Sequence, residues 1–170
     1  MNILFLTPRN SEKYLGGVEG HVRILTEELE RRGHEVKELS LDMVASIASL
    51  DSSTRRKLLA RNDRFLKFRA WGYLWRNRDL FKWADVVHVH DVFWWVMPLL
   101  PVIWWKKSNR ESPCHTARRH PIFVTFHGWE GVCPPSWSAV IQKRLASWLS
   151  NGTIGVGSFY EKWYGIKPDR

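Results

Sequence analysis

Apolar residues along the chain gather in five short runs. The run at 2–6 is continuous and ends at Thr7-Pro8, which is typical of a strand buried on both faces of a parallel sheet. Four further runs predict strands at 36–41, which is the weakest, 85–90, 122–126 and 152–156.

Residues at helical spacing fill the gaps between these runs. Apolar residues recur every three or four positions between 18 and 29, and Gly33 marks the end of that helix. Ser136 is a typical N-cap for a helix that follows it. Further helices are predicted within 55–82, over 92–105, where Pro98 bends or breaks the pattern, and over 158–164. Strands that alternate with helices predict an α/β fold with a parallel sheet.

The composition is that of an ordinary globular protein. The chain has 170 residues, 44% hydrophobic and 25% charged, which predicts one domain and excludes disordered and collagen-like classes. Two cysteines are too few for a disulfide-built scaffold and fit a reducing compartment. The N-terminus lacks the features of a secretory signal, and the longest apolar stretch is shorter than a membrane span. We therefore expect a soluble or peripheral protein.

The positive charge is concentrated in one segment. Of a formal net charge of +9, residues 55–82 carry +8, from ten Lys and Arg and two Asp. A basic amphipathic helix followed by aromatic residues is typical of a segment that binds an anionic membrane surface. The candidate docking residues are Arg56, Lys57, Arg61, Arg64, Lys67, Trp71 and Trp75. A solvated helix face that packs its apolar side on the core is the plainer alternative, and no motif supports nucleic acid binding.

Polar and glycine residues follow several of the predicted strands. In open α/β sheets, ligands bind beyond the carboxyl ends of the strands. Residues at these ends are Arg9, Gly16 and Gly17, then His90 and Asp91, then His127 and Gly128, and finally Gly157 and Ser158. Gly16-Gly17 would let a ligand approach the backbone at a helix N-terminus, although the pair matches neither phosphate-loop fingerprint and a plain tight turn is the alternative. His88 and His90 point to the same side of their strand, His88 towards the core and His90 nearer the edge.

The spacing of potential metal ligands supports no metal site. Between 114 and 133 the chain has two cysteines and three histidines, Cys114, His115, His120, His127 and Cys133, whose spacing matches no zinc pattern. The run His88-Val89-His90-Asp91 lacks the further histidine of dinuclear hydrolases. We expect no metal.

Four motifs together resemble the N-terminal part of retaining glycosyltransferases of the GT-B fold, specifically family four. They are Gly16-Gly17-Val18-Glu19 with His21, the strand motif at 84–90, the histidine motif Val124-Thr125-Phe126-His127-Gly128, and the segment 154–158 followed by 164–166. Their order and spacing fit over essentially the whole chain.

The resemblance implies a Rossmann-like domain that forms one half of a GT-B fold. In this family the N-terminal domain mostly binds the acceptor, and the C-terminal domain binds the nucleotide-sugar. We therefore expect residues 1–170 to be a single acceptor-binding domain without the donor-binding domain, which would act in cis or as a separate chain. We expect the chain alone to be inactive.

The resemblance also assigns roles to residues. Gly16 and Gly17 would approach the diphosphate of a UDP- or GDP-sugar co-substrate, and His127 would be the catalytic residue beside the reacting sugar. The remaining cleft residues would be Arg9, Glu19, His21, His90, Asp91, Thr125, Gly128 and Ser158. Neither a covalently bound cofactor nor a metal is implied.

The expected reaction transfers a hexosyl group to a saccharide or lipid-linked acceptor. Several family members act on lipid-linked acceptors at the cytoplasmic face of the membrane, which the basic segment at 55–83 would fit. Two alternatives stay open: half of a GT-B sugar-nucleotide epimerase, and a non-catalytic membrane-docking or binding module.

Overall fold

The structure is a computed structural model that describes residues 1–42, 64–91, 93–101, 121–127, 134–157 and 159–169. The strands are β1 Asn2–Thr7, β2 Glu35–Ser40, β3 Val86–His90, β4 Ile122–Phe126 and β5 Gly152–Gly155. The helices are α1 Gly17–Arg31, α4 Arg64–Arg76, α5 Arg78–Trp83, α6 Phe93–Val96, α8 Trp137–Leu149 and α9 Phe159–Tyr164.

The five strands form one parallel sheet in the order β2-β1-β3-β4-β5. The predicted α/β Rossmann-like fold and its five strands are therefore confirmed, with strand ends that differ by at most one residue. The chain leaves β1 first for β2 on one side and then for β3 on the other, so the strand order reverses between β1 and β3. A ligand crevice in this class of sheet lies beyond the carboxyl ends of the two strands at such a reversal.

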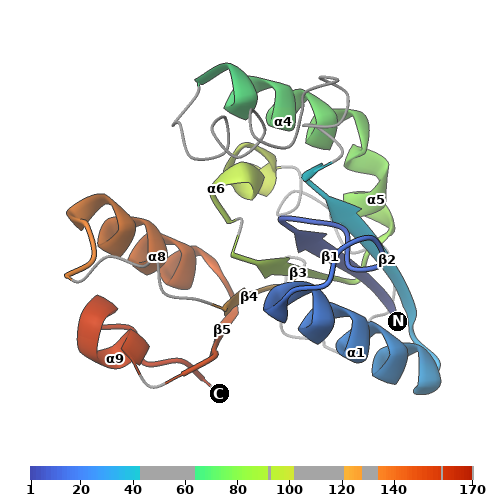
Figure 1. The fold of residues 1–170 in the computed structure, drawn as a ribbon. Helices are drawn as coiled ribbons and strands as arrows, with labels where there is room; N and C mark the ends of the chain where they lie inside the picture. The colour runs from blue at the N-terminus through green and yellow to red at the C-terminus, as the bar shows by residue number, and fades with distance from the viewer. Residues whose placement is uncertain (43–63, 92, 102–120, 128–133, 158, 170) are drawn as a thin grey trace.

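Helices cover both faces of the sheet, which explains why β1 is apolar at almost every position. Leu4 and Leu6 belong to the larger core cluster, on the face that α4, α5 and α6 cover. Ile3 and Phe5 point to the opposite face and pack with Val22 of α1. Figure 1 shows α1 on one side of β1 and β3, and α4, α5 and α6 on the other. A strand buried on both faces needs apolar side chains in both directions.

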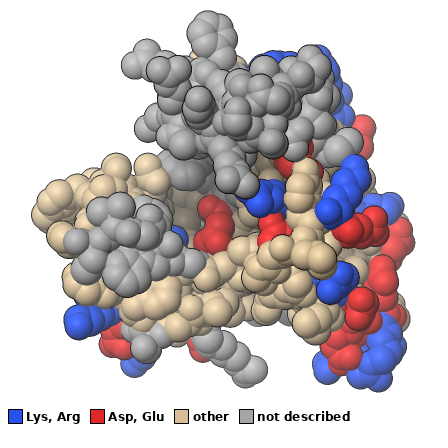
Figure 2. All heavy atoms as spheres, in the orientation of Figure 1, with Lys and Arg blue, Asp and Glu red and all other residues tan. Residues whose placement is uncertain are grey.

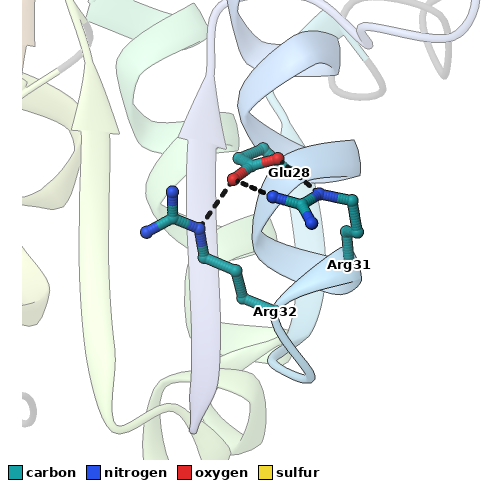
Figure 3. Close-up of polar contacts among 3 residues, drawn as sticks. All are labelled: Glu28, Arg31 and Arg32. Atoms are coloured by element: carbon teal, nitrogen blue, oxygen red, sulfur yellow. Dashed lines mark hydrogen bonds and ion pairs between the residues drawn. The ribbon is translucent and has the colours of Figure 1, made fainter.

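The end of α1 combines a backbone motif with an ion-pair cluster. Gly33 has a φ of 81°. Its amide donates to Glu30, and the amide of His34 donates to Leu29, which together form a Schellman motif. Figure 3 shows Glu28 between Arg31 and Arg32, which donate to its carboxylate at 2.7–2.8 Å. These hydrogen bonds, from Arg31 first, lower the pKa of Glu28 to about 2.

Two further expectations about helices are confirmed. The Oγ of Ser136 accepts a hydrogen bond from the Ala139 amide at 3.2 Å and caps α8. The helix predicted over 92–105 is interrupted near Pro98, because α6 ends at Val96 and a 3₁₀ turn follows over Met97–Leu99. Residues 102–105 lie outside the described residues.

The basic segment is described only in its second half. Helix α4 buries Ala70 and Leu74 and exposes Phe68 and Trp75, which are 62% and 50% accessible, while Trp71 is half-buried. Of the predicted docking residues, Arg56, Lys57 and Arg61 lie outside the described residues, as do the side chains of Arg64 and Lys67. In the part of the chain that the structure describes, no helix combines the length and the apolar character needed to cross a bilayer.

Candidate functional site

Four histidines meet near the carboxyl ends of β3 and β4. His88 and His90 lie on the same side of β3, as the strand alternation predicts, and their rings stack at 4.4 Å between centroids. The ring of His127, which follows β4, lies 5.0 Å from that of His90. His21 of α1 completes the group, with its ring 4.9 Å from that of His127. We call these four residues the histidine cluster.

Short hydrogen bonds hold the cluster together. His90 Nδ1 lies 2.7 Å from His127 Nε2, and His88 Nε2 lies 2.7 Å from the Oγ1 of Thr125 on the neighbouring strand. The Phe5 ring packs on His88 and His90 in edge contacts at 5.4 and 5.3 Å. The row of rings therefore extends from the sheet interior to the half-buried His127.

The surroundings of His88, His90 and His127 favour neutral imidazoles. Burial, followed by the positive charge that neighbouring histidines would carry, lowers the pKa of His88 to about 4. Burial and His21 lower the pKa of His127 to about 4 as well. Burial, with three histidine neighbours, lowers the pKa of His90 further still. At neutral pH these three rings each carry one proton.

Asp91 clamps the backbone of His127. Its φ of 58° lies in the left-handed region that Asp tolerates better than most residues. The amide of Asp91 donates to Thr125, and both of its carboxylate oxygens accept from the amide of His127, at 3.1 and 3.2 Å. The turn after β3 therefore positions the residue that follows β4.

Lys143 of α8 joins this site from a distant part of the chain. Its Nζ lies 3.9 Å from the Asp91 Oδ1, and its side chain is only 12% accessible. The ammonium also lies 5.0–5.6 Å from the ring centroids of Phe126, Tyr160 and Tyr164. Our sequence analysis missed Lys143. Its spacing from Ala139 and Ala146, both buried, was the available signal that it lies on the inner face of α8.

The glycine pair forms the start of α1. Gly16 is the N-cap residue and has an extended backbone, with a φ of −147°. The buried carboxylate of Glu19 lies against Gly16, where it would collide with a Cβ, whereas a Cβ at Gly17 would meet nothing within 4 Å. The helix N-terminus at Gly17 is therefore open on the side where a side chain would lie.

The loop between β1 and α1 is tied to β2. The Glu38 carboxylate accepts hydrogen bonds from the Oγ1 of Thr7 at 2.6 Å, from the amide of Ser11 at 3.0 Å and from the Oγ of Ser11 at 2.5 Å. This loop carries the exposed Arg9, whose guanidinium lies 5.7 Å from the Tyr14 ring centroid. Our sequence analysis also missed Glu38, although an acid inside a predicted strand was a signal.

The structure brings most of the predicted cleft residues to one edge of the sheet. Asp91 and His127 are in contact, His21 packs on His127, and Glu19 packs on Gly16. Figure 2 shows that this face of the molecule is hollowed between the α8 side and the remainder, with acidic and basic atoms on the walls. Gly128 and Ser158 lie outside the described residues.

Two of the predicted cleft residues are fully buried. His90 and Thr125 both have an accessibility of 0%, so any effect they have on a ligand passes through a neighbour. His90 is the last residue of β3 and so lies nearer the edge than His88, as expected, yet both are buried, with accessibilities of 0% and 8%. His21 of α1 and His127 pack against His90, and a strand pattern alone does not reveal these contacts.

Metal ligands are not assembled in the described part of the chain. No group of three or more His, Cys, Asp or Glu among those residues has the arrangement to hold a metal ion. Within the histidine cluster, the nitrogens of His90 and His127 are directed at each other. Cys114, His115, His120 and Cys133 lie outside the described residues.

Comparisons with known proteins point to one family. Neither the curated proteins nor the solved structures gave a match. The family model described as Glycosyltransferase Family 4 matches residues 15–163, a span that begins just before the glycine pair and includes the histidine cluster and Lys143. This is most of the chain, and the chain therefore belongs to Glycosyltransferase Family 4, as an N-terminal domain of the GT-B type.

Proposed function

We propose that the chain is the acceptor-binding half of a retaining glycosyltransferase that transfers a hexosyl group from a nucleotide-sugar to a saccharide or lipid-linked acceptor. The supporting observation is that α1, which begins at the glycine pair, places His21 against His127 at the carboxyl edge of the sheet, where the strand order reverses. Both lie within the span matched by the family model. A ligand at this edge would contact the start of α1 and His127 together.

In this proposal the start of α1 faces the diphosphate of a UDP- or GDP-sugar. The open space at Gly17 lets phosphate oxygens approach the backbone, and the positive end of the helix dipole favours their negative charge. Charge on the departing nucleotide diphosphate would be stabilised in the same way. A donor-binding domain, in cis or as a separate chain, supplies the opposite wall of the cleft.

His127 lies beside the reacting sugar in this proposal. Its ring is neutral, held from behind by His90 and fixed in its backbone by Asp91. Such a ring suits hydrogen bonding to sugar hydroxyls. The acceptor attacks on the same face from which the diphosphate leaves, and the reaction needs no metal ion or covalently bound cofactor.

A titration of the ¹⁵N-labelled chain tests where ligands bind. UDP-glucose, GDP-mannose and methyl hexosides are expected to shift the amide signals of Gly16, Gly17, His21 and His127. The signals of Arg31 and Arg32, at the other end of α1, are the internal control. Shifts confined to other parts of the chain would contradict the proposed site.

The division of labour between the two halves has a separate test. Because the donor site lies mainly in the other domain, residues 1–170 by themselves are expected to bind both sugar nucleotides weakly and to transfer no hexose. A micromolar Kd for either nucleotide-sugar, or sugar transfer by the purified chain alone, would contradict this division.

The proposed acceptor side includes docking of the basic segment to the cytoplasmic face of an anionic membrane. The charge of +8 over 55–82 and the exposed Phe68 and Trp75 of α4 support it. The chain is expected to co-sediment with phosphatidylglycerol vesicles in a salt-sensitive manner, and not with phosphatidylcholine vesicles.

A matched pair of variants separates this docking from general attraction. Substituting Gln at Arg56, Lys57, Arg61, Arg64 and Lys67 should abolish the binding. The control substitutes Gln at five exposed cations elsewhere, Lys13, Arg23, Arg32, Lys162 and Lys167, and should retain it. Equal losses in both variants would leave net charge as the cause and would contradict a docking segment.

A further inference from the structure

The hydrogen bond between two neutral histidines fixes what the outer histidine can offer a ligand. We propose that His90 is a positioning residue that sets the tautomer of His127, so that His127 presents its Nδ1–H as a donor to an oxygen of the bound sugar. The sugar as ligand rests on the proposed function. The tautomer itself rests on the hydrogen bond between the two neutral rings and on the burial of His90.

The contact between the two rings allows two proton arrangements. His90 Nδ1 and His127 Nε2 are 2.7 Å apart, so one nitrogen carries a proton and the other accepts it. In the first arrangement, His90 donates from Nδ1 and His127 carries its own proton on Nδ1. In the second, His127 donates from Nε2, and His90 must then carry its own proton on Nε2.

The burial of His90 selects the first arrangement. Its Nε2 is buried and has no hydrogen-bond partner among the described residues. The second arrangement would leave a buried N–H without an acceptor, and native proteins avoid this more strictly than a bare acceptor nitrogen. The apolar Phe5 ring also packs against the His90 ring, at 5.3 Å between centroids.

The first arrangement makes His127 a donor at the surface of the site. Its Nδ1 lies on the other side of the ring from His90, and no described residue hydrogen-bonds to it. An N–H in this position binds an oxygen lone pair, such as that of a sugar hydroxyl. It cannot remove a proton from the acceptor, because the only unprotonated nitrogen of His127 is directed at His90. The structure therefore assigns His127 to ligand recognition rather than to base catalysis.

The charged and titratable groups around the pair leave this arrangement intact. His21 packs on His127, His88 stacks on His90, and Asp91 accepts from the backbone amide of His127 rather than from its ring. Lys143 lies on the Asp91 carboxylate. None of these contacts joins a carboxylate to the His127 ring, so none of them favours a second proton on that ring.

Imidazole ¹⁵N spectra of the full chain at neutral pH test the tautomer without any ligand. The expected pattern is a protonated Nδ1 and a bare Nε2 on His127, with a protonated Nδ1 on His90. The reversed pattern, with a protonated Nε2 on His127, would overturn the inference whether or not sugars bind.

Variants at His90 test its positioning role. His90→Asn places an amide donor near the position of Nδ1 and is expected to retain the His127 tautomer. His90→Leu removes the donor, and His127 is expected to lose its fixed tautomer and show averaged ¹⁵N shifts. His88→Leu is the matched control, because His88 is buried in the same stack but hydrogen-bonds to Thr125 instead. An unchanged His127 spectrum in a folded His90→Leu chain would overturn the positioning role.

A second readout links the tautomer to the ligand. With methyl hexosides present, the Nδ1 signal of His127 is expected to shift in the parent chain and in His90→Asn, and to shift several-fold less in His90→Leu. If the free chain has the expected tautomer but no sugar moves this signal, the proposed sugar ligand is contradicted, while the effect of His90 on the ring remains supported.

Discussion

At the residue scale, the two adjacent glycines at the start of α1 have different surroundings. Gly16 is small because the buried Glu19 carboxylate occupies the space that a Cβ would need. A Cβ at Gly17 would meet nothing within 4 Å. The sequence pattern indicates a single glycine motif, but only Gly17 has open space for a ligand.

Alanine substitutions distinguish these two surroundings. Gly16→Ala should lower the free energy of unfolding by about 1–3 kcal/mol, because the Glu19 carboxylate must move from a packed position. Gly17→Ala should be neutral or slightly stabilising, since alanine favours the helix, yet it should weaken the amide shifts caused by UDP-glucose. Urea unfolding and the nucleotide-sugar titration measure the two effects. Equal destabilisation by both substitutions would contradict the assigned surroundings.

The sequence indicated the site residues better than their exposure. Strand alternation placed His88 and His90 on one side, and the structure confirms this. It could not show that His90 is fully buried, because that burial involves contacts with His21 and His127, which are distant from it in the chain. Lys143 was missed for a similar reason: a lysine on a helix is usually solvated, and only the fold brings it to Asp91.

At the element scale, Glu38 connects β2 to the loop that precedes α1. Its carboxylate accepts from the Thr7 hydroxyl and from both the amide and the hydroxyl of Ser11. This loop is long, and β1 alone would fix only its first residue. Glu38 therefore fixes the first part of the loop that carries Arg9.

Removing this connection should loosen the loop more than the sheet. Glu38→Ala should lower the free energy of unfolding by about 1–3 kcal/mol, because hydrogen bonds to a charged group are lost and the Thr7 and Ser11 hydroxyls are partly buried. The Ser11 amide should then exchange its hydrogen much faster. Glu35→Ala is the control on the same strand, since Glu35 has an exposed ion pair with Lys37 and should cost less than about 1 kcal/mol. Equal effects of the two substitutions would contradict the role of Glu38.

The elements themselves were predictable, but their order in the sheet was not. Continuous apolar runs give the strands, because strands covered on both faces need apolar side chains at successive positions. The same runs do not show that β2 lies beyond β1 while β4 and β5 lie beyond β3. That order creates the reversal between β1 and β3, and it depends on long-range packing that no local pattern contains.

At the scale of the whole molecule, the basic segment and the histidine cluster lie in different environments. The basic segment carries most of the net charge, and the described part of it exposes aromatic side chains on α4. At the carboxyl edge of the sheet, His88 and His90 are buried and His127 is half-buried, and burial lowers the pKa of all three. Solvated cations respond mainly to salt, whereas buried imidazoles respond to pH, so the two features respond to different solution conditions.

The buried histidines should make stability depend on pH in a defined window. Their folded pKa values lie below the ordinary value of 6.5, at about 4 for His88 and His127. As pH falls from 6.5 towards 4, these histidines therefore bind protons in the unfolded chain but not in the folded chain. The free energy of unfolding decreases as a result. Each such histidine contributes a slope of up to about 1.4 kcal/mol per pH unit, while above pH 6.5 its contribution is complete.

Urea unfolding at several pH values between 7.5 and 5.0 measures this slope. The range stays above the window of Glu28, whose lowered pKa makes its contribution decline only as pH falls below 4.5 towards about 2. The double variant His88→Gln, His127→Gln should be less stable at neutral pH. Its free energy of unfolding should depend less on pH between 6.5 and 5.0, because two of the histidines with lowered pKa values are gone. The slope therefore separates titration from packing. A parent chain whose free energy of unfolding is constant over that interval would show that the pKa values of His88 and His127 are not lowered in the folded chain.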